Sequence, residues 1–348
     1  SYNYAKTWLT TGWRIYSMIH QFELPIIESL QSILKNLQPL WIAISFLGDE
    51  TFYLLFMPLI YWCVDALVGL RIGVMLLLSG FSNGFLKMIF KSPRPFWVSE
   101  KITAGADHNS FGLPSGHAMN SAAVWGWTAR ESGRDWVKWG MGVLVFLIGF
   151  SRIVLGVHFI SDVLLGWLIG LLLIWLFSNN LQTLSSNLVR MPLNVKLALT
   201  VLSSLLMILL PVLVKTLSAG WLPPADWVAR AGEIDPMNLE FSLTISGLWL
   251  GMLGGFAILM HQKGVLQSKQ GDWQKVARYF VGVVGVLALY AGLGALFPDD
   301  VSLLSLVLRY VRYTLIGLWI AWGSPLLFDK LGVGVIKPYL PPQSSAQR

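Results

Sequence analysis

Long apolar runs separated by short polar stretches make up most of the chain after residue 48. The runs are continuous and do not alternate apolar with polar residues, which indicates helices, since only helices and closed barrels cross a bilayer. A span needs about 20 residues, within a range of about 17–25. We expect nine spans, of which the first, third and fourth must extend into flanking residues. The apolar segments lie near residues 51–64, 71–90, 115–129, 136–150, 158–177, 195–217, 239–260, 277–297 and 309–328.

The first 47 residues have a different pattern. Tyr and Trp are frequent before residue 17, which is typical of a membrane–water interface. Apolar residues are then mixed with charged ones such as Glu23 and Glu28, and Pro25 interrupts the segment. We therefore expect one or two helices that lie in the interface. No short apolar core leads to a small-residue cleavage site, so no cleavable signal peptide is expected.

The composition agrees with an all-α, polytopic membrane helix bundle. Apolar residues are 55% of the 348-residue chain, charged residues are 12%, and there are 17 Trp. One cysteine, Cys63, excludes an internal disulfide. The net charge of +7 is not gathered in a soluble basic domain or a basic run, so we expect no nucleic-acid partner.

Three short polar segments stand out between the second and fifth apolar runs. They cover residues 87–95, 114–117 and 151–162, and hold three cations, two histidines and one carboxylate. Ionisable residues at membrane depth are expensive and mark candidate functional sites. Snorkelling to the interface would explain any single Lys or Arg. It does not explain why, with nine spans, all three segments fall on one face of the membrane.

The charge distribution predicts which face this is. The face opposite the three segments carries thirteen Lys/Arg and five Asp/Glu. The face with the segments carries twelve Lys/Arg and thirteen Asp/Glu. Because excess Lys and Arg mark the cytoplasmic side, the polar segments are expected on the extracytoplasmic side. The C-terminus is expected in the cytoplasm.

The first two segments contain groups that suit a phosphate. Lys87 closes the second apolar run, and Arg94 follows between two prolines that end the helix. Two such cations match a dianionic group, and the guanidinium can bind two oxygens at once. Ser115 is a good N-cap for the third span, and Gly116 lets an anion approach the backbone amides. Ser115 alone would be an ordinary cap, but His117 follows it directly.

In the third segment, His158 and Asp162 are four residues apart, which places them on one face of a helix. The carboxylate can hold one ring nitrogen and leave the other free as base or nucleophile. Arg152 adds a third cation. Two histidines near three cations favour phosphoryl chemistry, with one histidine as nucleophile and the other as acid. The five His are scattered and show no metal-site spacing, so neither a metal nor another cofactor is expected.

These segments resemble the signature of the type 2 phosphatidic acid phosphatase superfamily, which also includes glucose-6-phosphatase and the vanadium haloperoxidases. The family pattern is Lys-x6-Arg-Pro, Pro-Ser-Gly-His and Ser-Arg-x5-His-x3-Asp, and all three parts occur here in order within residues 87–162. Residues 46–50 resemble sphingosine-phosphate phosphatases. Residues 94–97 and 114–119 are similar to glucose-6-phosphatase. No resemblance is found beyond about residue 180.

The resemblance implies a role for each site residue. It implies that His158 is the nucleophile, that Asp162 orients it, and that His117 protonates the leaving alcohol and later activates water. It also implies metal-independent hydrolysis with vanadate as an inhibitor. The residues that would hold the phosphoryl oxygens are Lys87, Arg94, Ser115, Gly116 and Arg152.

We expect a membrane phosphatase that hydrolyses a phosphate ester or diphosphate of a lipid through a phosphohistidine. The aromatic residues Phe96, Trp97, Phe111 and Trp221 are expected either to line the access route or to anchor the interface. A rim of charged side chains is expected from Arg230, Glu233, Asp235, Asp299 and Asp300. A soluble sugar-phosphate phosphatase of the glucose-6-phosphatase type is one alternative, and a non-catalytic accessory subunit of a membrane complex is another.

This hypothesis divides the chain into four parts: an interfacial segment 1–47, a catalytic helix core 48–180, additional transmembrane helices 181–330 and a polar tail 331–348. The expected location is the cell inner membrane or its equivalent. Expected partners are a lipid phosphate substrate and membrane lipids. The sequence is compatible with a homo-oligomer and with a partner in a membrane complex.

Overall fold

The computed structural model describes residues 2–339 except 107, 108, 233, 268–270, 299 and 301. Side chains of residues 2–17, 182 and 184 are outside the description. Three parts of the sequence predictions therefore cannot be placed: the early Tyr and Trp side chains, Glu233 and Asp299 of the expected rim, and the end of the polar tail from residue 340.

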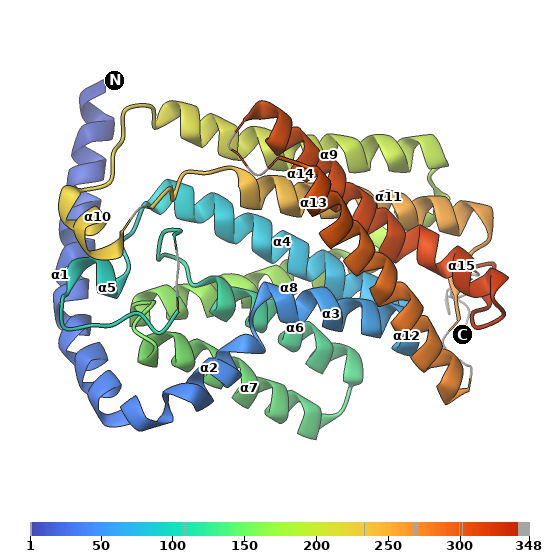
Figure 1. Cartoon of the computed structure of the whole chain (residues 1–348), viewed down its shortest axis with the longest axis horizontal. Coiled ribbons are helices and arrows are strands. Elements are labelled where there is room, and N and C mark those ends of the chain that lie inside the picture. The colour runs from blue at the N-terminus through green and yellow to red at the C-terminus, as the bar shows by residue number, and fades with distance from the viewer. Residues whose placement is uncertain are drawn as a thin grey trace.

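Nearly all of the described chain is helical (Figure 1). The N-terminal part consists of α1 (Tyr2–Leu34), the 3₁₀ turn η1 (Lys35–Leu37) and α2 (Gln38–Phe46). The second part consists of α3 (Glu50–Leu59), the π-helical turn η2 (Ile60–Val64), α4 (Ala66–Phe90), α5 (Pro95–Val98), α6 (Gly116–Ser132), α7 (Asp135–Val154) and α8 (Ile160–Arg190). The expected all-α membrane helix bundle is confirmed.

The rest of the chain adds a second group of helices. It consists of α9 (Leu193–Leu217), α10 (Ala225–Ala231), α11 (Glu240–Gln262), α12 (Asp272–Leu287), η3 (Ala288–Gly292), α13 (Leu293–Leu296), α14 (Leu303–Leu318), η4 (Trp319–Gly323) and α15 (Ser324–Lys330). Strands β1 (Val265–Leu266) and β2 (Ile336–Lys337) pair antiparallel, with Val265 opposite Lys337.

Polar residues mark the ends of α3 and α4. Asp49 accepts from the Thr51 amide at 2.9 Å at the start of α3, and Asp65 caps α4 in the same way. Such side chains satisfy amides that the first helical turn leaves unpaired. At the other end of α4, Lys91 adopts a left-handed conformation with φ of 50°. The chain therefore leaves α4 sharply, one turn after Lys87.

Seven helices in the described part of the chain are long and apolar enough to cross a membrane, or eight if the bent pair Met18–Phe46 and Glu50–Val64 forms one span. The predicted count of nine is not confirmed. The expected third span corresponds to α6, which has only 17 residues and includes buried polar residues. One of them, Asn120, accepts from Ser79 of α4 at 2.6 Å. Because α6 packs between α4, α7 and α8, these side chains meet protein and not lipid.

Glycines bring the central helices close together. A Cβ on Gly166 of α8 would lie 2.7 Å from the Ser115 carbonyl oxygen, and one on Gly170 would lie 2.7 Å from that of Met119. A Cβ on Gly247 of α11 would lie at the same distance from the Tyr310 carbonyl oxygen of α14. Gly166 and Gly170 are four residues apart, and this spacing of small residues places them on one face of α8 at its contact with α6.

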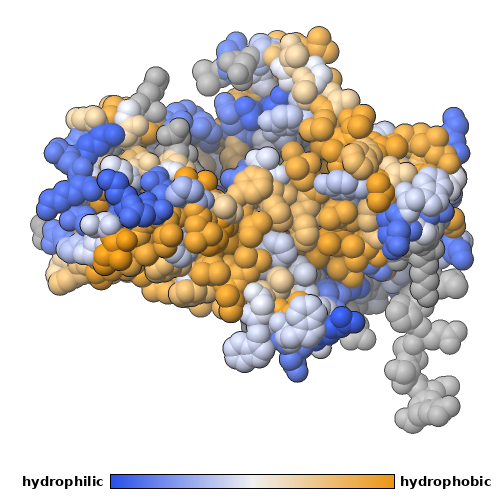
Figure 2. Space-filling model, turned by 60° about the horizontal axis from the view of Figure 1, so that its bottom comes forward, coloured by the Kyte–Doolittle hydropathy of each residue, from blue (hydrophilic) through white to orange (hydrophobic). Residues whose placement is uncertain are grey.

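Helix α1 crosses one end of the bundle, whereas α4, α8, α9 and α11 run along it (Figure 1). This orientation supports the predicted interfacial segment, which stays a prediction. Figure 2 shows a broad apolar surface over the middle of the molecule with hydrophilic residues at its margins. Such a surface suits a protein surrounded by lipid.

Candidate active site

Lys87 and Arg94 converge on one loop residue. Lys87 lies in the last turn of α4, and its Nζ donates to Ser110 Oγ at 3.0 Å. Arg94 immediately precedes α5, and its Nη2 donates to the same Ser110 Oγ, also at 3.0 Å. The hydroxyl holds both cations on one side of a shared cavity. The structure thus brings together the two cations that the sequence pattern paired.

Arg94 is fully buried, and backbone carbonyls satisfy its guanidinium. Nε donates to the Ser110 carbonyl at 2.6 Å, Nη1 to that of Val157 at 2.9 Å, and Nη2 to that of Phe111 at 3.2 Å. A buried charge is tolerated when it is hydrogen-bonded in this way. These bonds leave the guanidinium no freedom to rotate, so it is a fixed positive group.

His158 lies between Arg94 and Asp162. Its Nδ1 is 3.2 Å from Asp162 Oδ2, and its Nε2 is 3.2 Å from Arg94 Nη1. Asp162 is fully buried and also accepts from the Phe159 amide at 3.0 Å. A carboxylate at Nδ1 favours the proton on that nitrogen, which leaves a lone pair on Nε2. The arrangement therefore prepares Nε2 to act as a nucleophile or base.

The turn before α6 is tied to the first turn of α8. The Ser115 amide donates to the Asp162 carbonyl at 2.9 Å, and Ser115 Oγ caps α6 by accepting from the Ala118 amide. Gly116 lies against α4, where a Cβ would be 3.0 Å from Asn83 Oδ1. Two helix starts and the end of α4 therefore meet at one point.

His117 faces the same cavity from α6. Its Nε2 is 3.7 Å from Asp49 Oδ2, the carboxylate that caps α3. Only 15% of the His117 side chain is exposed. A histidine with a carboxylate at one nitrogen can hold and release a proton at the cavity wall.

The cavity that these residues surround has a volume of about 550 Å³. Five of the eight predicted site residues are on its wall: Lys87, Arg94, Gly116, His117 and His158. Asp162, Ser115 and Arg152 lie behind the wall. Asp162 and Ser115 support His158 and α6. Arg152 is 2% exposed and donates to Ser45 Oγ of α2, so it ties the end of α7 to the N-terminal part.

Several polar residues at the site were missed from the sequence. Ser110, Asn83, Asp49 and Glu50 line the cavity together with Asp235 from the predicted rim. Ser110 is a loop serine with no sequence signal. Asp49 and Glu50 are two adjacent carboxylates at the start of an apolar run, which is a signal of an ionisable group at membrane depth.

Helix α1 contributes support from behind the site. Glu23 accepts from the Ser161 amide at 2.9 Å and from the Ser161 hydroxyl at 3.1 Å. His20 stacks on Phe159 with ring centroids 3.5 Å apart. Both contacts hold the turn that carries His158. Glu23 interrupts an otherwise apolar stretch, but nothing in the sequence indicates that it contacts α8.

The predicted aromatic access route is wrong for Trp97 and Phe111, which are fully buried in a cluster with Trp227 of α10. Closely packed aromatic rings bury large apolar areas, so these residues stabilise the loops above the site. Arg230 of the predicted rim contacts Glu100 and Asp226. Asp300 lines a separate small cavity, and Glu233 and Asp299 lie outside the described residues.

Among the residues that the structure describes, no group of three or more His, Cys, Asp or Glu side chains could hold a metal ion. The cavity wall carries the cations Lys87 and Arg94 and the histidines His117 and His158, together with three carboxylates and several hydroxyl and amide side chains. This set can bind oxygens of a phosphoryl group and exchange protons with it.

Comparison with known proteins agrees with this chemistry. Residues 68–185 match the PAP2 superfamily, and residues 243–335 match the PAP2 superfamily phosphatase transmembrane extension. The expectation that nothing beyond residue 180 resembles a known family is therefore wrong. That second region is mostly apolar helix and carries no catalytic motif by which to recognise it.

Three relatives illustrate the similarity. Glucose-6-phosphatase 3 of Rattus norvegicus is 26% identical over 334 residues, which cover 83% of this chain and 89% of the relative. Sphingosine-1-phosphate phosphatase 2 of Mus musculus is 32% identical over 140 residues, covering 37% and 38% of the two chains. Phosphatidylglycerophosphatase B of Bacillus subtilis (strain 168) is 42% identical over 77 residues, covering 20% and 38%.

The two family matches together cover more than half of the chain, and the first contains all three polar segments. The helical fold, the apolar surface and the cluster of two histidines with buried cations fit the same assignment. The chain therefore belongs to the PAP2 superfamily of membrane phosphatases.

Proposed function

We propose that this protein hydrolyses a phosphate ester or diphosphate of a lipid, on the extracytoplasmic side of the membrane, through a phosphohistidine intermediate. The observation that carries the proposal is the position of His158, with Asp162 at Nδ1 and Arg94 at Nε2 on the wall of the cavity. The similarity to phosphatases named for phosphatidylglycerophosphate and sphingosine 1-phosphate supports a lipid substrate.

In the first step, His158 Nε2 attacks the phosphorus atom. The nitrogen–phosphorus bond forms as the bond from phosphorus to the ester oxygen breaks, and His117 gives its proton to the leaving alkoxide. Lys87, Arg94 and the Gly116 amide stabilise the negative charge on the phosphoryl oxygens. Asp162 stabilises the positive charge that His158 acquires.

In the second step, His117 takes a proton from water, and the hydroxide attacks phosphorus. The nitrogen–phosphorus bond breaks, the electron pair returns to His158 Nε2, and inorganic phosphate leaves. We propose that Ser115 and Arg152 position the surrounding helix ends and that the Arg152 charge adds to the positive potential. Fixed cations can neutralise a phosphoryl group without a metal ion, so we propose metal-independent catalysis.

The test measures phosphate release by purified protein in detergent with EDTA. The substrates are phosphatidic acid, phosphatidylglycerophosphate, a polyprenyl diphosphate, sphingosine phosphate and glucose 6-phosphate. His158→Ala is compared with wild type, and His261→Ala at the far end of α11 is the matched control. We expect release from at least one lipid, lost only in His158→Ala and blocked by vanadate.

A sugar phosphate is the second candidate substrate, because the similarity to glucose-6-phosphatase 3 extends over most of both chains. Hydrolysis of glucose 6-phosphate with no release from any lipid would establish this alternative. Release that stops when EDTA is added would contradict metal independence. A base-stable, acid-labile label on wild type but not on His158→Ala, from substrate labelled in the phosphate, would demonstrate the phosphohistidine.

A further inference from the structure

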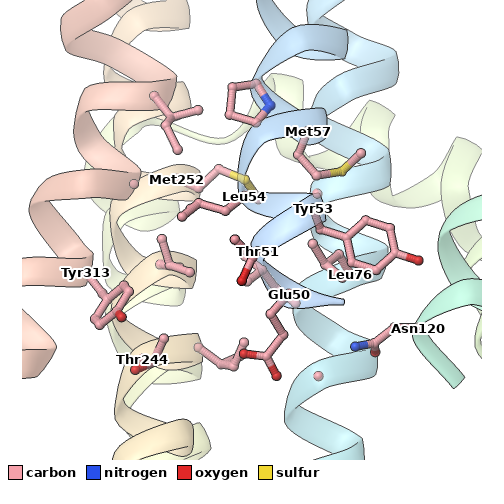
Figure 3. A pocket seen from close by; sticks show the side chains of 18 of the residues that line it. Glu50, Thr51, Tyr53, Leu54, Met57, Leu76, Asn120, Thr244, Met252 and Tyr313 are labelled. Carbon is pink, nitrogen blue, oxygen red and sulfur yellow. The ribbon is translucent and has the colours of Figure 1, made fainter. Parts of the chain in front are cut away.

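A second cavity, of about 220 Å³, adjoins the phosphate cavity. It lies between α3 and α4 on one side and α11 and α14 on the other (Figure 3). Four residues line both cavities: Glu50, Thr51, Asn120 and Phe241. The two cavities therefore adjoin at these four residues, which we call the junction. We call the second cavity the apolar chamber.

The lining changes from polar to apolar away from the junction. Figure 3 shows Glu50, Asn120 and Thr244 at one end of the chamber, with Leu54, Met252 and Met57 farther along. An apolar space with a polar mouth at a phosphate site fits a molecule with a charged head and a hydrocarbon chain.

The chamber follows α3 and the start of η2, from Glu50 to Tyr61. Eleven residues at the helical rise correspond to a depth of about 16 Å. At the far end, the Tyr61 hydroxyl donates to the Ala321 carbonyl of η4 at 3.1 Å. This bond joins the helices before residue 190 to the second group of helices. It also limits the length of hydrocarbon chain that fits.

The chamber also borders the lipid. Tyr290 of η3 lines it and is 43% exposed. Tyr290 lies within Asp272–Leu296, one of the candidate membrane spans. A chain can therefore reach the chamber sideways from the bilayer, while its headgroup stays at the level of the phosphate cavity.

We propose that the apolar chamber holds one hydrocarbon chain of the substrate while the phosphate lies at Lys87 and Arg94. Helices α11 and α14, within the region that matches the transmembrane extension, then select which chains are accepted. This inference rests on the proposed lipid phosphatase function. It gives the second group of helices a role in substrate selection.

The test narrows the chamber and measures chain selectivity. Leu54→Trp places an indole in the middle of the chamber. The matched control is Leu209→Trp on α9, where the Leu209 side chain is 61% exposed. Methyl, octyl, dodecyl and hexadecyl phosphate are offered at equal mole fraction in detergent micelles. We expect Leu54→Trp to lower the ratio of kcat/KM for dodecyl to that for methyl phosphate by about tenfold or more, because each methylene that a hydrophobic pocket gains or loses changes kcat/KM by about 10–200-fold. Leu209→Trp should keep the wild-type ratio.

A second measurement does not depend on the folding of a variant. Wild-type protein is illuminated with an alkyl phosphate that carries a diazirine at the end of its chain, and labelled peptides are mapped. Label on α3, α11 or α14 that unlabelled dodecyl phosphate displaces supports the proposal. Label in the chamber that dodecyl phosphate does not displace would mean that the chamber takes up hydrocarbon chains as it would a membrane lipid. That result would overturn the proposal.

The two proposals fail in different ways. If wild type hydrolyses alkyl phosphates but Leu54→Trp keeps its selectivity and the label lies elsewhere, the chamber is not the chain site and the lipid phosphatase function stands. If wild type hydrolyses only methyl phosphate and glucose 6-phosphate, the lipid phosphatase function itself is wrong.

Discussion

At the scale of single residues, Asp162 determines the state of His158. Its Oδ2 is shared between His158 Nδ1 and the Phe159 amide, and its side chain is fully buried. A carboxylate can only accept at this position, so it selects the tautomer with the proton on Nδ1. The lone pair is then on Nε2, the nitrogen that lies 3.2 Å from Arg94 Nη1. Removing the charge while keeping the shape isolates this effect.

We predict that Asp162→Asn lowers kcat on the best lipid phosphate by about 10³–10⁴-fold, with a smaller change in KM, because the amide can favour the wrong tautomer. The measurement is steady-state phosphate release. Asp272→Asn, on the exposed first turn of α12, is the control. Equal kcat for Asp162→Asn and wild type would rule out the proposed role of the carboxylate.

At the scale of elements, helix α1 packs against residues 158–162, the turn that carries His158, which we call the catalytic turn. Glu23 accepts two hydrogen bonds from Ser161, which lies between His158 and Asp162. Gln31 of the same helix bonds to Thr103. A helix that crosses the end of the bundle in this way can shift the geometry of His158 without touching substrate. Glu23 is therefore a positioning residue.

We predict that Glu23→Ala lowers kcat by about ten- to a hundredfold, because small misplacements of a reacting group are costly. Glu23→Gln keeps an acceptor oxygen and should recover most of the activity. The comparison variant is Glu28→Ala on the same helix, which removes a bond to Ser99 away from the catalytic turn. Equal kcat losses for Glu23→Ala and Glu28→Ala would argue for a purely structural effect of α1.

At the scale of the whole molecule, the orientation of the bundle decides from which side substrate is hydrolysed. The site lies where α4 ends and where α3, α6 and α11 begin, as shown by Lys87, Glu50, Gly116 and Phe241 on the cavity wall. Helix α11 runs from this end to Gln262 at the opposite end. Loops at the two ends of α11 can therefore report the orientation.

We predict that a cysteine at Asn238, on the cavity side, reacts with a membrane-impermeant maleimide in intact cells. A cysteine at Lys263 should react only after the membrane is permeabilised. The native Cys63 is buried, so its background labelling should be low. The reverse pattern of labelling would place the active site in the cytoplasm and contradict the charge-based orientation.

The sequence by itself was sufficient for the fold class and for the family. Continuous apolar runs report directly on burial in lipid, and the three polar segments carry the charged groups of the site in a fixed order. Such signals are local, so they can be read without knowing which helices are neighbours. The count of spans did not follow from the sequence, because α6 is short and enclosed by protein, which relaxes the requirement for an apolar sequence.

Only the tertiary structure decided which residues meet across the bundle. Ser110 bridges Lys87 and Arg94, Glu23 reaches α8 from a distant helix, and Arg152 lies behind the cavity wall. It also revealed the apolar chamber, whose two walls are far apart along the chain. The physical reason is that contacts between distant segments follow from helix packing, and packing depends on the shape of whole faces. No single stretch of sequence contains that information.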